Sequence, residues 1–289
     1  MANSSLTTPP NINEAKRAAR HAATGHWMTA LARLGYAAKG VVYLLVGVLA
    51  GELAIGKGGK VPDNTTALQE IYSQPLGHFL LIVLTIGLFS FALWSVIQAI
   101  FDTEGKGRKA GGLVARIGYL GVAVSYAALG FAAINLLTGS GSAGKGADAT
   151  AQDWTARLLN LPFGVALVVL VGLVALGVAC VLFYKAYKAT FRQKLSLATL
   201  RPEVTRGVIF LGRLGYAALG IVATIIGAFL IVAALNYNPD EAKGLSGALV
   251  TLLQQPFGPV LLGIVAIGLM AYGLYSFIEV RYRRLAGRV

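Results

Sequence analysis

The chain has 289 residues, of which 56% are hydrophobic and only 13% are charged, and its mean hydropathy is +0.68. This composition leaves too little polar surface to cover a soluble globule, so it excludes a soluble fold and indicates a bilayer protein. The net charge of +13 would suit a nucleic-acid-binding protein, unless the topology accounts for it.

Residues 1–28 are predicted to form a cytoplasmic segment before the first apolar run. Residues 1–10 are expected to be disordered, and Asn11 to Met28 are expected to form a short helix on the membrane surface. The segment lacks the basic, apolar and small-residue order of a cleaved signal peptide. The first apolar run is therefore expected to act as an uncleaved anchor.

Six apolar runs follow, each long enough to cross a hydrocarbon core of about 30 Å as a helix rising about 1.5 Å per residue. They are continuous rather than alternating, which excludes the strands of a β-barrel. We therefore predict an all-α integral membrane protein with six transmembrane helices. The runs fall near residues 37–55, 77–101, 117–138, 163–184, 214–236 and 257–279.

A threefold repeat organises these helices. Each odd-numbered helix opens with Arg-x-Gly-Tyr and carries a further Gly fourteen residues after the Arg, and each even-numbered helix opens with Pro-x-Gly. A fixed-period repeat of this kind outweighs local propensity in assigning architecture. The tetrads start at Arg33, Arg116 and Arg213; the later glycines are Gly47, Gly130 and Gly227; the Pro-x-Gly triplets start at Pro75, Pro162 and Pro256.

The repeat divides the chain into repeat 1 (29–104), repeat 2 (105–188), a basic cytoplasmic linker (189–212), and repeat 3 with a basic tail (213–289). Two crossings per unit give all copies the same orientation, so the repeats are parallel and can close into a pseudo-threefold ring. Between the two helices of each repeat, a polar stretch predicts a short interfacial helix on the outer face. The Pro is then expected in the first turn of the next helix.

The tetrads are predicted to set the depth of the odd helices. An Arg can extend to cytoplasmic phosphates, and a Tyr suits the headgroup region. The membrane-anchoring residues would then be Arg33, Tyr36, Arg116, Tyr119, Arg213 and Tyr216. The fourteenth-position glycines lie near mid-bilayer and are expected to allow close helix packing.

Most of the 25 Lys and Arg residues fall in the N-terminal segment, the two loops on the same side, and the tail. This positive-inside pattern places both termini in the cytoplasm. It also accounts for the excess charge through attraction to anionic lipids, so no nucleic-acid partner is predicted. A membrane-protein partner or a homo-oligomer remains open.

The triplicated Arg-x-Gly-Tyr helices, each paired with a Pro-x-Gly helix, resemble the bacterial membrane family known as domain of unknown function 1206. The resemblance spans roughly residues 29–285. It implies the repeated architecture and a location in the bacterial inner membrane, and it carries no activity to transfer to residues of this chain.

Departures from the repeat are better candidates for function than its shared positions. Repeat 1 alone has Lys39, where the other copies have Val122 and Leu219, and it alone has Glu52 near the outer boundary. Ionisable residues at membrane depth indicate function by default. However, both lie near a boundary, where extension of the side chain to the nearer surface would suffice.

The even helices carry a polar residue at one shared position, near their inner ends. These residues are Gln98, Lys185 and Glu279. In a closed ring they could face one another, with Lys185 and Glu279 paired; alternatively, they only mark the membrane boundary.

Signals for catalysis are scarce in this sequence. The three histidines do not have the spacing of metal ligands, and no nucleotide loop or nucleophile motif is present. No catalytic residue, cofactor or metal is therefore predicted. The leading hypothesis is a non-enzymatic scaffold or accessory subunit of a membrane assembly; the alternative is a small channel or transporter with a path at the repeat interface.

Overall fold

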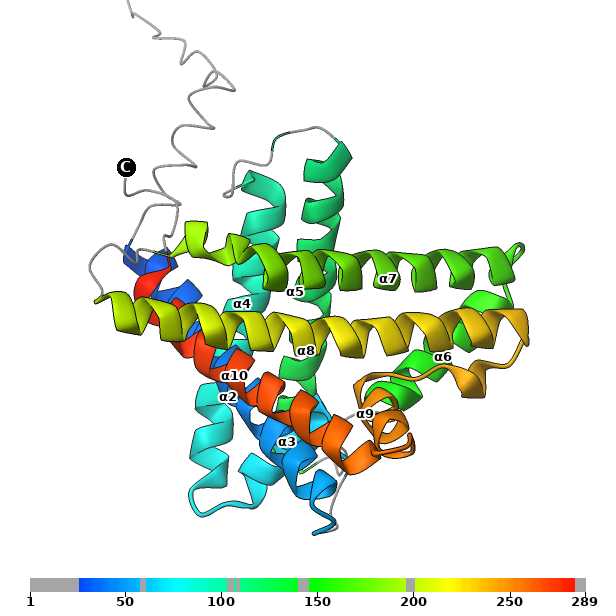
Figure 1. Cartoon of the computed structure of the whole chain (residues 1–289), viewed down its shortest axis with the longest axis horizontal. Helices are drawn as coiled ribbons and strands as arrows, with labels where there is room; N and C mark the ends of the chain where they lie inside the picture. Colours follow the sequence, from blue (N-terminus) through cyan, green and yellow to red (C-terminus); the bar gives the residue numbers. More distant parts are fainter. Residues whose placement is uncertain are drawn as a thin grey trace, which may run out of the picture.

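The computed structural model describes residues 26–57, 61–102, 107, 110–139, 146–195 and 201–283. The predicted disordered tip and most of the N-terminal segment lie outside these residues, as does the tail from residue 284. The described chain is helical throughout its regular elements (Figure 1). In order these are α2 (His26–Ala54), α3 (Asn64–Ser73), α4 (Gly77–Phe101), α5 (Ala110–Leu137), α6 (Ala147–Leu159), α7 (Gly164–Lys188), η1 (Thr190–Lys194), α8 (Pro202–Leu235), η2 (Pro239–Glu241), α9 (Leu245–Leu253) and α10 (Gly258–Tyr282).

Six of these helices are long and apolar enough to cross a membrane: α2, α4, α5, α7, α8 and α10. They confirm the predicted six spans and their assignment to three repeats. One boundary differs, because α8 begins at Pro202, within the segment predicted as a linker. Pro202 occupies the first turn of α8, where its missing N–H costs no hydrogen bond.

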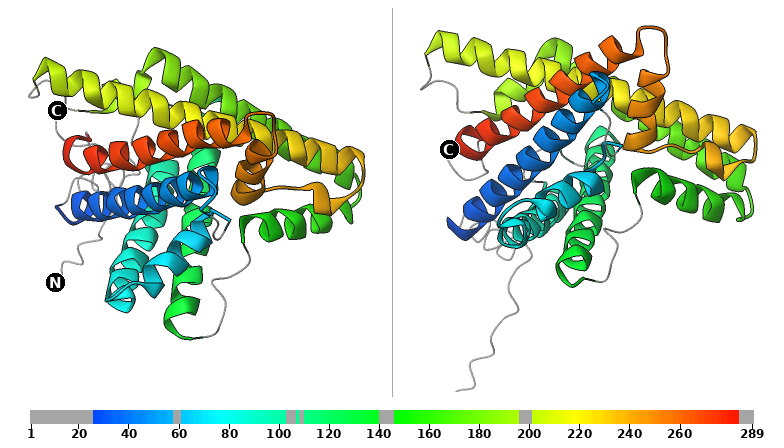
Figure 2. Two further views of the ribbon diagram at one scale, coloured as in Figure 1. Left: turned by 60° about the horizontal axis from the view of Figure 1, so that its bottom comes forward. Right: turned by 90° about the horizontal axis from the view of Figure 1, so that it is seen from below.

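The spans pack in the order α5, α4, α2, α10, α8, α7. In both views of Figure 2, α2 and α10 lie side by side, with the α7–α8 pair on one side of them and the α4–α5 pair on the other. The first and last spans of the chain are thus direct neighbours.

The contacts between successive repeats are equivalent in all three copies. They join α4 to α5, α7 to α8, and α10 to α2. Each is centred on the fourteenth-position glycine: a Cβ on Gly47 would lie 2.6 Å from Met270, and one on Gly130 would lie 2.9 Å from Phe89. A Cβ on Gly227 would lie 3.0 Å from Leu176. The predicted close packing at these glycines is confirmed.

The contacts within repeats do not complete the predicted pseudo-threefold ring. α2 packs against α4 in repeat 1, and α8 packs against α10 in repeat 3. Among the described residues, α5 and α7 of repeat 2 do not pack along their lengths. The ring is therefore open at one of its six interfaces, and α5 and α7 are its free edges.

The short helices α3, α6 and α9 confirm the helix expected between the two spans of each repeat. They are tied together by carboxylates at their N-termini. Asp63 caps α3 by accepting a hydrogen bond from Thr66 N (2.6 Å), and its other oxygen accepts one from Ala147 N at the start of α6 (3.1 Å). Asp148 of α6 similarly accepts bonds from two amides at the start of α9. Carboxylates at these positions satisfy free amides and complement the helix dipoles.

The Pro-x-Gly triplet forms a turn before each even helix, rather than the first helical turn as predicted. The helices begin at Gly77, Gly164 and Gly258, and the residue between Pro and Gly is left-handed, with φ of 60 to 65°. A Pro followed by a left-handed residue is the pattern of a type II turn. The Gly is required by space, since a Cβ on Gly164 would lie 2.4 Å from Leu158 O.

Candidate functional site

The charged site of this fold lies beside a close contact between the backbones of α2 and α10. Gly40 and Gly273 face each other there: a Cβ on Gly273 would lie 2.8 Å from Gly40 O, and one on Gly40 would lie 3.1 Å from Gly273 O. The absence of these side chains brings the two backbones together. Lys39 precedes Gly40 in α2, and its side chain therefore reaches the face of α10 that packs against α2.

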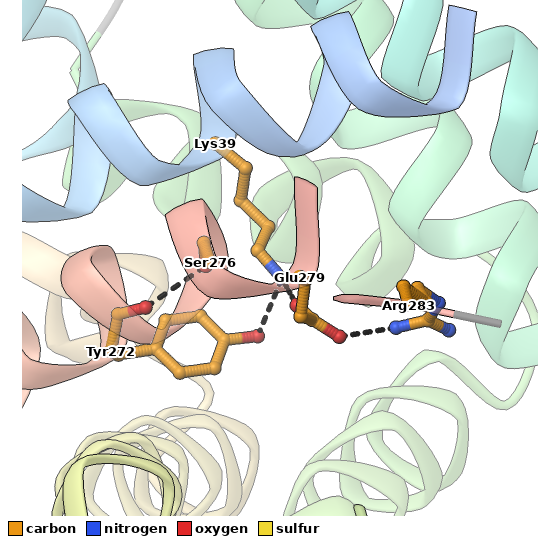
Figure 3. Close-up of polar contacts among 5 residues, drawn as sticks. All are labelled: Lys39, Tyr272, Ser276, Glu279 and Arg283. Carbon is orange, nitrogen blue, oxygen red and sulfur yellow. Dashed lines mark hydrogen bonds and ion pairs between the residues drawn. The ribbon is translucent and has the colours of Figure 1, made fainter. Parts of the chain in front are cut away.

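Lys39 is buried and makes two polar contacts with α10 (Figure 3). Its ammonium donates to Glu279 Oε2 at 3.1 Å and to Tyr272 Oη at 3.1 Å. Only 6% of Lys39 and 2% of Glu279 is exposed. The ion pair is thus removed from solvent, which makes each partner dependent on the other.

A second cation completes the site. Arg283 follows the last turn of α10 and contacts Glu279 Oε1, so the two oxygens of Glu279 serve different cations (Figure 3). Both contacts are charge-assisted hydrogen bonds, the stronger class in proteins. We call Lys39, Tyr272, Glu279 and Arg283 the α2–α10 charge cluster.

Aromatic faces surround the cations of this cluster. The Lys39 ammonium lies 4.6 Å from the ring centroid of Tyr272, 5.0 Å from that of Tyr36 and 5.5 Å from that of Phe91. The Arg283 guanidinium lies 4.6 Å from the centroid of Tyr36. Ring faces carry negative electrostatic potential, so they partly replace the water that these cations lose on burial.

Lys39 and Glu52 of repeat 1 have different environments. Lys39 was expected to extend to the nearer surface, and this expectation is wrong, because α10 provides Glu279 and Tyr272 closer than the surface. Glu52 is exposed in the last turn of α2, beside a shallow groove that Glu70 and Gln74 also line. It is not part of the charge cluster.

The predicted cluster of Gln98, Lys185 and Glu279 does not form. Glu279 uses its oxygens for Lys39 and Arg283 instead of Lys185. Lys185 is half-buried, with its ammonium 5.5 Å from the Tyr216 ring centroid. Gln98 is buried in α4. Each even helix packs against the odd helix of the next repeat. Lys185 and Glu279 accordingly contact residues of α8 and α2 rather than of the other even helices.

The tyrosines of the tetrads are not surface anchors in two of the repeats. Tyr36 and Tyr216 are buried, and Tyr119 is half-buried. Tyr36 packs edge-to-face on Phe91, and Tyr216 packs on Tyr272. The tetrad glycine explains this position: its close contact with the neighbouring span turns the next residue toward the helix interface.

Two of the three tetrad arginines contact the ends of preceding helices. Arg116 donates to the carbonyls of Ala99 and Ile100 at the end of α4, and Arg213 donates to Tyr187 O at the end of α7 (3.4 Å). Cations at a helix C-terminus satisfy free carbonyls and complement the dipole. Arg33 is exposed.

Sequence reasoning missed Tyr272 and Arg283, and it assigned Glu279 the wrong partner. The repeat contained the required signal. Gly47 packs on Met270, and Lys39 lies about two helical turns before Gly47, while Glu279 lies about two turns after Met270. In antiparallel neighbouring helices Lys39 and Glu279 therefore lie side by side. Assuming that the even helix of repeat 3 packs on the odd helix of repeat 1, as in the other repeats, would have paired these two residues.

Within the described residues, no group of three or more His, Cys, Asp or Glu side chains could hold a metal ion. The charge cluster has one carboxylate between two cations, with aromatic rings against the cations. Its evident chemical role is to neutralise buried charge and to join α2 to α10.

The fold and site define a multi-pass membrane protein built from three two-helix repeats. The family model described as Domain of Unknown Function (DUF1206) matches the chain three times, at residues 34–102, 117–189 and 214–283. The chain therefore belongs to this family, as its resemblance indicated. It is 36% identical over 262 residues to the protein named "Uncharacterized protein YxxB" of Bacillus subtilis (strain 168), covering 91% of this chain and 94% of that protein. No solved structure matches.

Proposed function

We propose that the protein is a non-enzymatic scaffold or accessory subunit of an assembly in the bacterial inner membrane. The observation that carries this proposal is the α2–α10 charge cluster. Its buried charges are satisfied by one another and by Tyr272, and they connect the first span to the last. Charges that serve transport generally line a pathway or a water-filled cavity. Lys39 and Glu279 are instead buried and paired with each other.

The short helices support the same conclusion from the other end of the spans. Asp63 joins α3 to α6, and Asp148 joins α6 to α9, by hydrogen bonds to main-chain amides. These contacts fix the three repeats to one another outside the spans. The architecture thus favours a framework over a path for solutes.

The proposed orientation places both termini in the cytoplasm, with basic segments against anionic lipid headgroups. A C-terminal reporter that is active only in the cytoplasm should therefore be active. Activity of a periplasm-dependent reporter at the same position would overturn the orientation.

Native purification tests the scaffold proposal. The tagged full chain, expressed at its natural level, is extracted in mild detergent and analysed by quantitative mass spectrometry. We expect another membrane protein, or further copies of the chain, in a fixed ratio that persists when the tag is moved to the partner.

Reconstitution of the protein in liposomes tests the channel or transporter alternative. Purified chain in liposomes should leave the permeability to protons, K⁺ and small anions equal to that of empty liposomes. Flux above that level, reduced by substitution of Lys39 or Glu279, would replace the scaffold by the channel or transporter alternative.

A further inference from the structure

Repeat 2 exposes the faces that the other repeats bury between their own two spans. On α7, 59% of Val174 and 48% of Val178 is exposed. On α5, a Cβ added to Gly118 or Gly121 would meet nothing within 4 Å. The other copies show which helix covers the corresponding residues.

In repeats 1 and 3, one contact within the repeat pairs a glycine of the even helix with an alanine of the odd helix. A Cβ on Gly87 would lie 2.6 Å from Ala38 Cβ, and a Cβ on Gly268 would lie 2.4 Å from Ala218 Cβ. The corresponding residues of repeat 2 are Gly121 on α5 and Val174 on α7. In repeat 2 the glycine is therefore on the odd helix, and the larger residue is on the even helix.

A second contact follows the same rule. The tetrad glycines Gly35 and Gly215 pack against the backbones of Phe91 and Tyr272, which a Cβ would approach to 2.8 and 2.7 Å. In repeat 2 the corresponding pair is Gly118 and Val178. At both positions, repeat 2 thus has a glycine on α5 opposite a larger side chain on α7. A glycine opposite a larger residue lets membrane helices pack closely.

The connection between α5 and α7 permits this contact. It runs from Leu137 to Gly164 through α6 and is longer than the connections from Ala54 to Gly77 and from Leu235 to Gly258. Those connections already allow their flanking spans to pack. Chain length therefore does not hold α5 and α7 apart.

A bilayer also favours the contact. In Figure 1, α4 and α5 run up the view, whereas α7 and α8 run across it. Transmembrane helices are tilted by at most about 40° from the bilayer normal. Bringing α7 alongside α5 would align the two pairs so that all six spans can cross one membrane.

We propose that α5 and α7 close against each other through the Gly118–Val178 and Gly121–Val174 contacts, completing the threefold ring in the membrane. In the arrangement of Figure 1 the two spans of repeat 2 are not packed against each other. Lipid tails are as apolar as these faces, so van der Waals packing rather than water exclusion would distinguish the states.

Disulfide crosslinking of the full chain in native membranes tests the contact. Cys180 is the chain's single cysteine, so Cys180→Ser supplies a cysteine-free background. We expect G121C/V174C to form an intramolecular disulfide as readily as A218C/G268C, the corresponding positions of the packed repeat 3. The control is V114C/V174C. Val114 lies on the same face of α5 as Gly121 but about 10 Å away along the helix, which is beyond disulfide reach.

A swap of side-chain size tests the complementarity. The V178C/G118C pair reports closure, while Gly121→Val places two valines at the other contact. We expect Gly121→Val to reduce crosslinking at least fivefold, and G121V/V174G to restore it, because the double variant has the glycine-on-α7 arrangement of repeats 1 and 3. Equal monodisperse yields would show that the variants fold.

Two outcomes would overturn the proposal. Failure of G121C/V174C to crosslink, while A218C/G268C does so, would show that α5 and α7 remain apart in the bilayer. Crosslinking confined to dimers on a denaturing gel would show that a second copy, rather than the chain itself, covers these faces.

Discussion

Substitutions in the α2–α10 charge cluster should have unequal and strongly coupled effects on stability. Glu279→Gln leaves Lys39 with Tyr272 Oη and ring faces as its remaining partners, and leaves Arg283 close to a second cation. Lys39→Met leaves Glu279 paired with Arg283. The first variant therefore strands buried charge, and the second does not.

The geometry sets the expected magnitudes. At 3.1 Å, opposite unit charges attract by about 5 kcal/mol at an effective dielectric constant of about 20. Much of this offsets desolvation, but loss of one partner of a buried pair typically costs about 3–5 kcal/mol. We expect that loss in unfolding free energy for Glu279→Gln, and about 1–3 kcal/mol for Lys39→Met, which loses a charged hydrogen bond.

A double-mutant cycle measures the coupling. Unfolding is followed in mixed micelles by denaturing detergent titration for the single variants and for K39M/E279Q, with Lys57→Met as an exposed control expected to change little. The double variant should be less destabilised than the sum of the singles by at least about 1 kcal/mol, since residues in contact are not additive. Additive losses, or a larger loss for Lys39→Met than for Glu279→Gln, would refute the described pairing.

Three further predictions concern two repeated packing positions and one helix cap, each measured by thermal unfolding in detergent. Gly47→Leu should destabilise the chain by about 1–3 kcal/mol through overpacking against α10, whereas Gly51→Leu on the same helix has open space and should not. Gly164→Ala should lower the unfolding temperature because its Cβ would collide with a carbonyl, while Gly177→Ala on the same helix should raise it slightly through helix propensity. Asp63→Ala should cost about 0.5–2 kcal/mol through loss of the α3 cap. An unchanged Asp63→Ala variant, or glycine pairs that respond equally, would contradict these assignments.

Six spans, three repeats and the close contacts at the fourteenth-position glycines could be predicted from sequence because each depends on local or repeated information. Apolar length identifies a span, and Gly at one position in three copies indicates one packing role. The neighbour of that glycine could not be assigned in this way. Gly47, Gly130 and Gly227 are equally compatible with any even helix until the packing order is known.

The polar residues near the inner ends of the even helices show the effect of not knowing the packing order. Gln98, Lys185 and Glu279 occupy one position of the repeat, so ring symmetry alone predicted that they face one another. The packing order instead places Lys185 beside Tyr216 of α8 and Glu279 beside Lys39 of α2. The tyrosines of the tetrads were misassigned for a related reason, since an amphipathic ring suits both the headgroup region and a polar-aromatic interior.

The similarity of the three repeats explains why the charge cluster lies between α2 and α10. The glycine face of α2 is similar to those of α5 and α8, so packing alone would let it accept α4, α7 or α10. Two of the three contacts between repeats join spans that are consecutive along the chain, whereas the α2–α10 contact joins residues 240 positions apart. Only that contact needs a partner specified against alternatives. At the position of Glu279, α7 has Lys185, which would repel Lys39, and α4 has the neutral Gln98. The ion pair therefore selects α10 and rejects α7 by like charge, at a cost in desolvation that an apolar contact would avoid. We infer that the departures from the repeat, which suggested a functional site, specify the order in which three nearly equivalent units assemble.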